Sequence, residues 1–289
     1  MKHHISQFRF WAIGLITVWL ALFVFMPNVL VLITSVLTRD TVDTVALPFN
    51  VENYVRTLDI LYLQVLLDSL GMSLLAMVVC LLIGYPFAMC IAQLPKRWQP
   101  ILLFLVILPF WTNSLVRTYA LQFILGNKGL INNLLLWVGV IEKPLQLLYT
   151  KFAVVLGLSY ILLPFMVLPL FSALEKLDVR LLHAAKDLGA GAFHRFWRIT
   201  VPLTSPGIVA GCLMVLLPAM GMFYISDLLG GKNLLLGNVI KTQFLNTRDW
   251  PFGSALSVLL IVLLGLMLWL YFRAAKFVSR QGGINDSDF

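Results

Sequence analysis

The chain has 289 residues, of which 60% are hydrophobic and 12% are charged, and its formal net charge is +8. Soluble domains carry about a quarter charged residues, so this composition excludes an ordinary water-soluble fold and indicates a membrane protein. The positive charge gathers in segments predicted to face the cytoplasm, so we attribute it to membrane topology and expect no nucleic-acid partner.

Six long apolar runs predict six membrane-spanning helices. Each run has the roughly 20 residues needed to cross a hydrocarbon core about 30 Å thick. Every backbone N–H and C=O in lipid must be paired internally, so each run is expected to be helical. We therefore predict an all-α membrane protein with a single transmembrane domain over residues 1–289. The predicted spans are about 10–38, 64–92, 101–125, 152–174, 203–225 and 254–277.

The distribution of Lys and Arg predicts the orientation of these spans. With the N-terminus inside, the inner segments hold twelve cations and five acids. The outer segments and the spans together are almost neutral, so both termini are expected on the cytoplasmic side of a bacterial inner membrane.

The third predicted span, 101–125, is interrupted near its middle. Pro109 removes a backbone donor and clashes with the preceding turn, so the helix is expected to break there. The polar residues Thr112, Asn113 and Ser114 follow at once. Polar residues at this depth either line a cavity or hold neighbouring helices together, and both interpretations stay open.

Arg117 lies in the same span, and an intramembrane arginine normally has an acidic partner. Candidates are Asp227 or an acid from another chain. A polycationic substrate would be repelled by Arg117, so we interpret this residue as part of a structural or gating ion pair.

The inside loop 175–202 carries the next informative pattern. Its first half has apolar residues at helical spacing, which predicts a short amphipathic helix. Gly189 then stands where a helix C-terminus favours glycine. A second short helix is expected to carry Phe193, Phe196 and Trp197, and Pro202 is expected to mark the start of the fifth span.

The fifth predicted span, 203–225, begins with small residues and ends with polar ones. Gly207 and Gly211 form a GxxxG pattern, which close helix packing explains. Pro218 follows, and Asp227 is expected near the outer end of this span.

The 175–202 loop resembles the loop of ABC-importer permeases, whose pattern is E-A-A, three residues, G, nine residues, then I-x-L-P. Residues 183–189 read His-Ala-Ala-Lys-Asp-Leu-Gly, and Ile199 with 201–203 completes the match. The resemblance implies a coupling helix that docks in a groove of the ATPase subunit. The residues it assigns to this coupling are His183, Ala184, Ala185, Lys186, Asp187, Leu188, Gly189 and Ala190. His183 replaces the usual Glu, so either the contact is weaker or Glu175 or Asp187 supplies the charge.

Further segments resemble the permease subunits of spermidine/putrescine importers across about residues 20–280. They are residues 109–119, 217–231, 237–240 and 246–253. The resemblance implies the ABC-permease architecture and transport of polyamines by alternating access. It also implies three kinds of partner besides membrane lipid: a sister permease, two ATPase subunits and a periplasmic polyamine-binding protein.

A polyamine has two or three ammonium groups on a flexible chain, so its site is expected to offer carboxylates and aromatic faces. The residues of suitable type that we predict along the substrate pathway are Phe110, Trp111, Asn113, Tyr119, Tyr224, Asp227 and Asp249. Each aromatic residue has membrane-interface or core packing as its alternative. Asp249, between Arg248 and Trp250, could equally belong to a loop turn before Pro251.

No GxxxxGK[ST] phosphate loop occurs in the chain, so ATP is expected to be bound by a separate subunit. The cysteines and histidines show no metal-binding spacing, and we expect no cofactor and no metal. No catalytic cluster occurs, so we expect a transporter subunit rather than an enzyme. The alternatives are the same machine for another solute, such as thiamine, iron or an organophosphonate, or an ion-coupled secondary transporter.

Overall fold

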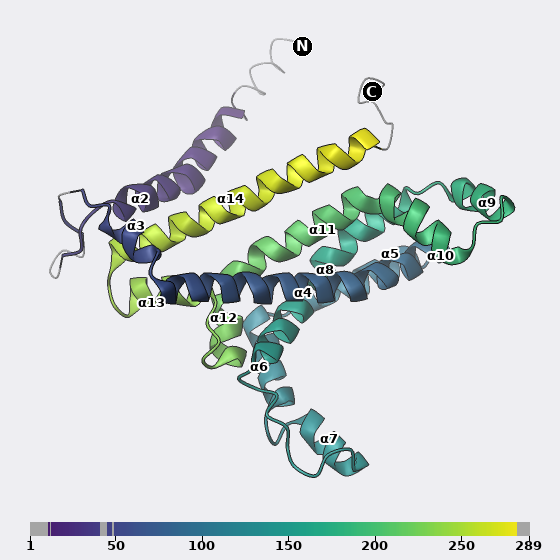
Figure 1. Ribbon diagram of the computed structural model, residues 1–289, viewed down its shortest axis with the longest axis horizontal. Helices are drawn as coiled ribbons and strands as arrows, with labels where there is room; N and C mark the ends of the chain where they lie inside the picture. Colours follow the sequence, from purple (N-terminus) through teal and green to yellow (C-terminus); the bar gives the residue numbers. More distant parts are fainter. Residues whose placement is uncertain (1–10, 12, 41–44, 48, 282–289) are drawn as a thin grey trace. The chain divides into compact units, whose positions relative to one another are not determined.

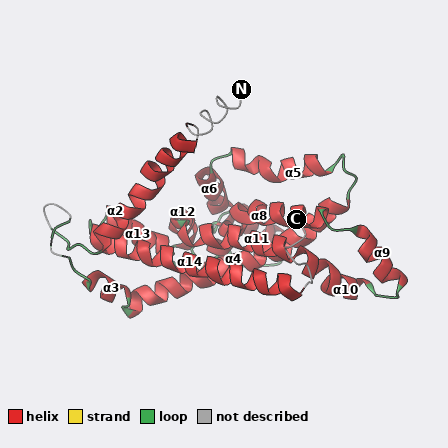
Figure 2. Cartoon of the chain, turned by 90° about the horizontal axis from the view of Figure 1, so that it is seen from above, coloured by secondary structure: helices red, strands yellow, loops and turns green. Residues whose placement is uncertain are grey.

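The structure, a computed structural model, describes residues 11, 13–40, 45–47 and 49–281. Across these ranges the regular structure is helical, and the one extended pairing is an isolated bridge between Thr38 and Ala46. The predicted all-α fold is therefore confirmed (Figure 2). The predicted start of the first span at residue 10 lies outside the described residues.

The chain forms two compact units, and each is described by itself. The first unit comprises residues 1–63 and 239–263, and the second comprises 64–238 and 264–289. The helical elements in chain order are η1 Ala21–Phe25, α2 Met26–Ser35, α3 Glu52–Thr57, α4 Ile60–Gln93, α5 Gln99–Ile107, η2 Leu108–Trp111, α6 Ser114–Leu125, α7 Leu130–Val138, α8 Lys151–Glu175, α9 Val179–Asp187, α10 Ala192–Arg195, η3 Phe196–Thr200, α11 Val201–Gly221, α12 Phe223–Ile225, η4 Ser226–Gly230, α13 Leu236–Leu245 and α14 Trp250–Gln281.

The long apolar helices agree with the predicted spans. Among the described residues, five helices are long and apolar enough to cross a membrane, and a sixth is added if one bent pair counts as a single span. The five are Ile13–Ser35, Ile60–Gln93, Lys151–Glu175, Ala192–Gly221 and Trp250–Leu270. The bent pair is Gln99–Trp111 with Ser114–Val138, which meet at 89°. The third predicted span is therefore not one straight helix.

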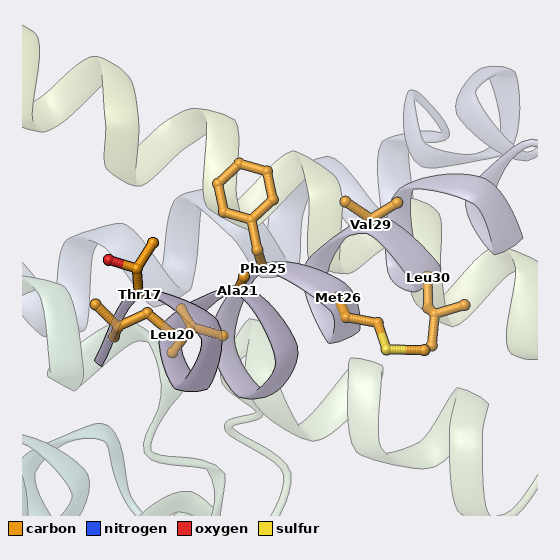
Figure 3. A pocket seen from close by; sticks show the side chains of 8 residues that line it. Thr17, Leu20, Ala21, Phe25, Met26, Val29 and Leu30 are labelled. Carbon is orange, nitrogen blue, oxygen red and sulfur yellow. The ribbon is translucent and has the colours of Figure 1, made fainter. Parts of the chain in front are cut away.

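The first apolar helix belongs to the first unit and contains a π-helical turn, η1, followed by α2. Beside this turn lies a hollow of about 590 Å³ (Figure 3). Its lining comes from one helix: Thr17, Leu20, Ala21, Val24, Phe25, Met26, Val29 and Leu30. Because a single helix supplies all of these side chains, the hollow is a groove in a helix surface and not an enclosed cavity.

Helix α8 contributes more residues to the core of the second unit than any other described helix. Figure 1 shows α8 beside α4 and α11. A side chain at Gly207 would lie 2.4 Å from the Cβ of Ala173, and one at Gly211 would lie 2.7 Å from the Sδ of Met166. Residues larger than glycine would push α8 and α11 apart, so the close packing expected from the GxxxG pattern is confirmed.

The fifth span has different limits from those predicted. The helix runs without interruption from Ala192 to Gly221, so Pro202 lies inside it, where the helix continues from η3 into α11. Pro202 follows the π-helical turn η3 by two positions, so the continuous helix accommodates it next to an irregular turn. At the other end α11 stops at Gly221 because Met222 leaves the helical region, so Asp227 is not on this helix.

The orientation of the spans can be tested with reporter fusions. We expect a periplasm-active reporter, such as alkaline phosphatase, to be active when fused after Gly139 and inactive when fused after Pro95 or Leu188. The reason is the excess of Lys and Arg in the segments near Pro95 and Leu188. A cytoplasm-active reporter at the same three positions should give the opposite pattern. The reverse result in both series would overturn the predicted cytoplasmic location of the termini.

Candidate transport route and coupling surface

The third span breaks where the sequence predicts. Helix α5 passes into the short 3-10 turn η2, and Thr112 is then extended, with φ −88° and ψ 142°. Asn113 caps the next helix, since its side chain accepts a hydrogen bond from the Leu115 N–H at 2.9 Å. The Thr112 hydroxyl donates to the Pro109 carbonyl at 2.7 Å. These polar side chains therefore pair backbone groups that the break leaves without helical partners.

The predicted pathway residues near this break point in different directions. Trp111 is 74% exposed and meets Phe104 edge to face, with ring centroids 5.5 Å apart. Phe110 is half-buried and packs against Phe165 at 5.1 Å. Asn113 and Tyr119 are exposed on the second unit. The structure thus leaves Trp111, Asn113 and Tyr119 on the surface and turns Phe110 inward.

A second interruption follows Gly221 and is stabilised by Asn238. The side-chain amide of Asn238 donates to the Phe223 carbonyl at 2.9 Å and to the carboxylate of Asp227. Its side-chain oxygen accepts from the Leu235 N–H at 2.9 Å. Asn238 is buried, whereas Asp227 is exposed. This buried amide therefore fixes the position of a surface carboxylate.

Two aromatic rings precede Asp227. The rings of Phe223 and Tyr224 lie 6.3 Å apart in an edge-to-face arrangement. Helix α6, which carries Tyr119, packs against both α12 and η4, which carry Tyr224 and Asp227. The structure therefore places three of the predicted pathway residues on adjoining elements of the second unit.

Close approach at two glycines makes this arrangement possible. A Cβ at Gly157 would lie 2.6 Å from the Cδ1 of Leu229, and a Cβ at Gly237 would lie 2.8 Å from the Gly221 carbonyl oxygen. Larger residues at these positions would displace η4 or the start of α13.

Asp249 lies in the first unit and has a different setting. It is 2% exposed, and its carboxylate accepts a hydrogen bond from Arg56 at 3.1 Å and lies 3.8 Å from Arg39. The same carboxylate accepts from the Phe252 N–H at 3.2 Å. These contacts match the loop-turn interpretation, while a role of Asp249 in the substrate pathway stays a prediction.

The predicted pairing of Arg117 with Asp227 is wrong. Among the described residues, Arg117 forms no ion pair, and the Nε of its guanidinium has no hydrogen-bond partner. The guanidinium lies instead over two rings, 5.3 Å from the centroid of Phe110 and 5.9 Å from that of Tyr160. The other predicted candidate, an acid from another chain, stays open.

The 175–202 loop begins with the predicted amphipathic helix, α9. Asp178 caps it by accepting from the Arg180 N–H at 2.9 Å. At the other end Gly189 has φ +83°, a conformation that costs glycine little. The N–H of Gly189 bonds to the Lys186 carbonyl and that of Ala190 bonds to the Ala185 carbonyl, both at 2.9 Å. These two backbone hydrogen bonds form a Schellman motif, so the predicted glycine cap is confirmed.

The residues assigned to coupling lie on a protruding surface. Figure 1 shows α9 and α10 beyond one end of α8 and α11. Residues 183–187 form the last part of α9 and 188–190 form the turn; all are exposed except the half-buried Ala185 and Ala190. Leu188 is 89% exposed, and Phe193 and Trp197 are also exposed. An apolar surface of this kind at one end of a helical pair is typical of a protein-binding site.

Phe223 and Asn238 belong to the candidate site but were not predicted from the sequence. Asn238 stands in one of the segments that carry the family resemblance, and a polar residue among Leu and Val was the available signal. Its role could not be recognised, because its partners lie 11 and 15 positions away along an irregular loop.

The fold is that of the permease subunits of ABC transporters. A crystal structure of a bacterial alginate ABC transporter, in complex with an alginate-bound periplasmic protein, superposes with a TM-score of 0.76 over 96% of this chain and 97% of the other, at 15% identity. A second structure, of an ABC transporter that imports the acidic polysaccharide alginate, gives 0.72 over 96% and 98%, at 18% identity.

The sequence comparisons define the family. Residues 6–280 match the binding-protein-dependent transport system inner membrane component family, and the chain belongs to this family. It is 56% identical to the spermidine/putrescine transport system permease protein PotB of Salmonella typhimurium (strain SL1344), over 96% of each chain. It is 57% identical to the Escherichia coli (strain K12) protein of the same name, over 91% of this chain and 96% of the relative. The chain is therefore a multi-pass inner-membrane transport subunit and not an enzyme.

The exposed position of Leu188 gives a test of the coupling surface. Leu188→Asp should reduce substrate-stimulated ATP hydrolysis by the assembled complex about tenfold, because a charge would be placed in an apolar contact. The amount of this chain in the membrane should not change, since the side chain packs against little of its own subunit. Val140→Asp, which changes another exposed apolar residue in a different loop, is the matched control. Normal hydrolysis in the Leu188 variant would contradict a docking role.

The contacts of Asp249 predict a stability effect. Asp249→Ala removes a helix cap and hydrogen bonds to a charged partner, which together are worth about 2 kcal/mol. Arg39 and Arg56 are about half exposed, so water would solvate them after the change. The free energy of unfolding should therefore fall by no more than this amount. We expect a lower temperature of heat-induced aggregation in detergent. Loss of polyamine uptake by Asp249→Asn at unchanged heat stability would instead favour a pathway role.

Proposed function

We propose that this chain forms half of the translocation route of an ATP-driven importer for polyamines such as spermidine and putrescine. Relatives 54–57% identical to it are named as permeases of spermidine/putrescine transport systems. The proposed partners are an ATPase subunit, a sister permease and a periplasmic polyamine-binding protein. The chain itself would hold no cofactor, since nucleotide would be bound by the ATPase.

The observation that carries the proposed substrate class is the setting of Asp227. An exposed carboxylate held by the buried amide of Asn238 lies three positions after Tyr224 of the aromatic pair Phe223 and Tyr224. An ammonium group would pair with the carboxylate, and the methylenes beside it would pack on the rings. Each cation–π contact is worth about 0.5–2 kcal/mol. An importer of anions would instead need cationic groups at this position.

Coupling to ATP would act through the 175–202 loop. The exposed apolar residues Leu188, Phe193 and Trp197 would be seated in the ATPase. Movement of the loop would pass directly into α11, because the helix is continuous from Ala192 to Gly221. It would also reach α4, since Phe196 packs against Tyr85 at 5.5 Å. In this way closure of the ATPase subunits would move the helices next to the substrate route.

Asp227→Asn tests the proposed substrate contact. The change keeps the size of the side chain and removes its charge, so the KM for spermidine uptake should rise about tenfold or more. Glu142→Gln, which removes an exposed acid from another loop of the same unit, is the matched control and should leave the KM unchanged. Uptake and substrate-stimulated ATP hydrolysis that are unaltered in the Asp227 variant would remove this residue from the site.

Uptake in cells that lack the ATPase subunit separates the proposed importer from an ion-coupled secondary transporter. We expect no uptake of labelled spermidine without the ATPase. Uptake that persists and depends on the proton gradient would establish the other mechanism. If spermidine is not transported but another solute is, the ABC mechanism would hold with a different substrate.

A further inference from the structure

Arg117 lines a cavity of about 330 Å³ in the second unit. The cavity lies among α4, α5, α6 and α8, and most of its walls are hydrocarbon. The lining residues are Phe87 on α4, Leu102, Leu105 and Val106 on α5, Pro109 just after α5, Arg117 on α6, and Tyr160, Leu163, Pro164 and Val167 on α8. Phe87 and Leu105 are partly exposed, so one side of the cavity reaches the surface of the unit.

The guanidinium is the one fully charged group among the residues that line this cavity. Arg117 is 8% exposed, and among the described residues it has aromatic contacts but no acid and no hydrogen-bond partner for its Nε. Ring faces compensate a buried cation only in part. An arginine at membrane depth is expected to be paired, so the cavity is incomplete without an anion.

The depth of Arg117 favours a carboxylate from a protein over a lipid phosphate. Helix α5 begins after Lys96, Arg97 and Trp98, residue types that anchor a helix at the membrane surface. The 13 residues from Gln99 to Trp111 rise about 20 Å from that surface. Because the next helix turns by 89°, Arg117 stays near this depth, in the interior of the hydrocarbon core.

The shape of the cavity favours the same conclusion. A phosphate headgroup brings several polar groups that need hydrogen bonds, whereas the walls offer mainly hydrocarbon besides Arg117 and the hydroxyl of Tyr160. An Asp or Glu side chain on an apolar helix brings two oxygens that match the fork of the guanidinium, and its remaining surface suits the walls.

We propose that this cavity is a docking site for a membrane-embedded carboxylate of the sister permease, which forms an intersubunit ion pair with Arg117. The proposal rests on the two-permease complex described under the proposed function. Arg117 would then act in assembly, at a distance from the cationic substrate, and the isolated subunit would carry an unpaired buried charge that assembly neutralises.

The test compares assembly with the stability of the chain itself. In the full complex extracted in detergent, Arg117→Gln should lower the amount of co-purified sister permease about tenfold or more, as measured by mass spectrometry. Arg117→Lys, which keeps the charge, should retain part of the association. Arg97→Gln is the matched control, because it removes an exposed arginine and should change nothing.

The full chain expressed alone provides the second measurement. If Arg117 is unpaired in the subunit, Arg117→Gln should leave its heat stability unchanged or raise it. A fall in the heat stability of the isolated chain would show a structural arginine and overturn the proposal. Normal assembly with one anionic phospholipid fewer per complex, detected by native mass spectrometry, would identify a lipid phosphate and overturn it too.

An unchanged complex with unchanged lipid content would likewise overturn the proposal. None of these measurements uses transport as its readout. Failure of the docking proposal is therefore distinguishable from failure of the proposed polyamine import.

Discussion

The pairing of backbone polar groups is the constraint on which the structure of this chain depends. Lipid supplies no hydrogen-bonding groups, so a helix can be interrupted only where groups of the protein, or water in a cavity, replace the lost hydrogen bonds. Asn113 does this at the start of α6, and Asn238 does it beside η4. Asn132 does it in the segment between α6 and α8, where it bonds to the carbonyls of Gly126 and Leu145 and to the N–H of Leu145.

These interruptions have a functional consequence in the account we propose. A continuous apolar helix presents only side chains to its surroundings, whereas a broken helix with internal pairing can hold polar groups at membrane depth. Two of these breaks, at Thr112 and at Met222, are followed by residues of types suited to a cationic solute. Asp227 illustrates the principle most clearly, because the amide that pairs the loop backbone also holds its carboxylate.

The features that the sequence predicted are those determined by neighbouring residues. The apolar runs located the long helices, Pro109 located the break, and Gly189 located the end of α9. The GxxxG spacing likewise predicted the close helix packing at Gly207 and Gly211. Each of these features depends on the spacing of apolar or small residues, on the backbone N–H that proline lacks, or on a φ angle that glycine permits. All three can be recognised without knowing the fold.

The features that the sequence did not predict depend on partners distant along the chain. Arg56 and Asp249 are 193 positions apart, so their ion pair could not be inferred from spacing. Gly237 lies against Gly221 at the end of the fifth span, a contact between residues on separate helices that spacing does not indicate. The absence of an acid beside Arg117 among the described residues depends on how α5, α6 and α8 pack.

The central claim is that this chain forms half of a translocation route, along which we predict Trp111, Asn113 and Tyr119, and cysteine accessibility tests it most directly. In a chain whose Cys80, Cys90 and Cys212 are replaced by alanine, single cysteines at Trp111, Asn113 and Tyr119 would be treated with a cationic, water-soluble thiol reagent in the assembled complex. We expect these cysteines to react and spermidine to slow the reaction. Reaction only with a membrane-soluble reagent, with no effect of spermidine, would place this surface in lipid and contradict the account.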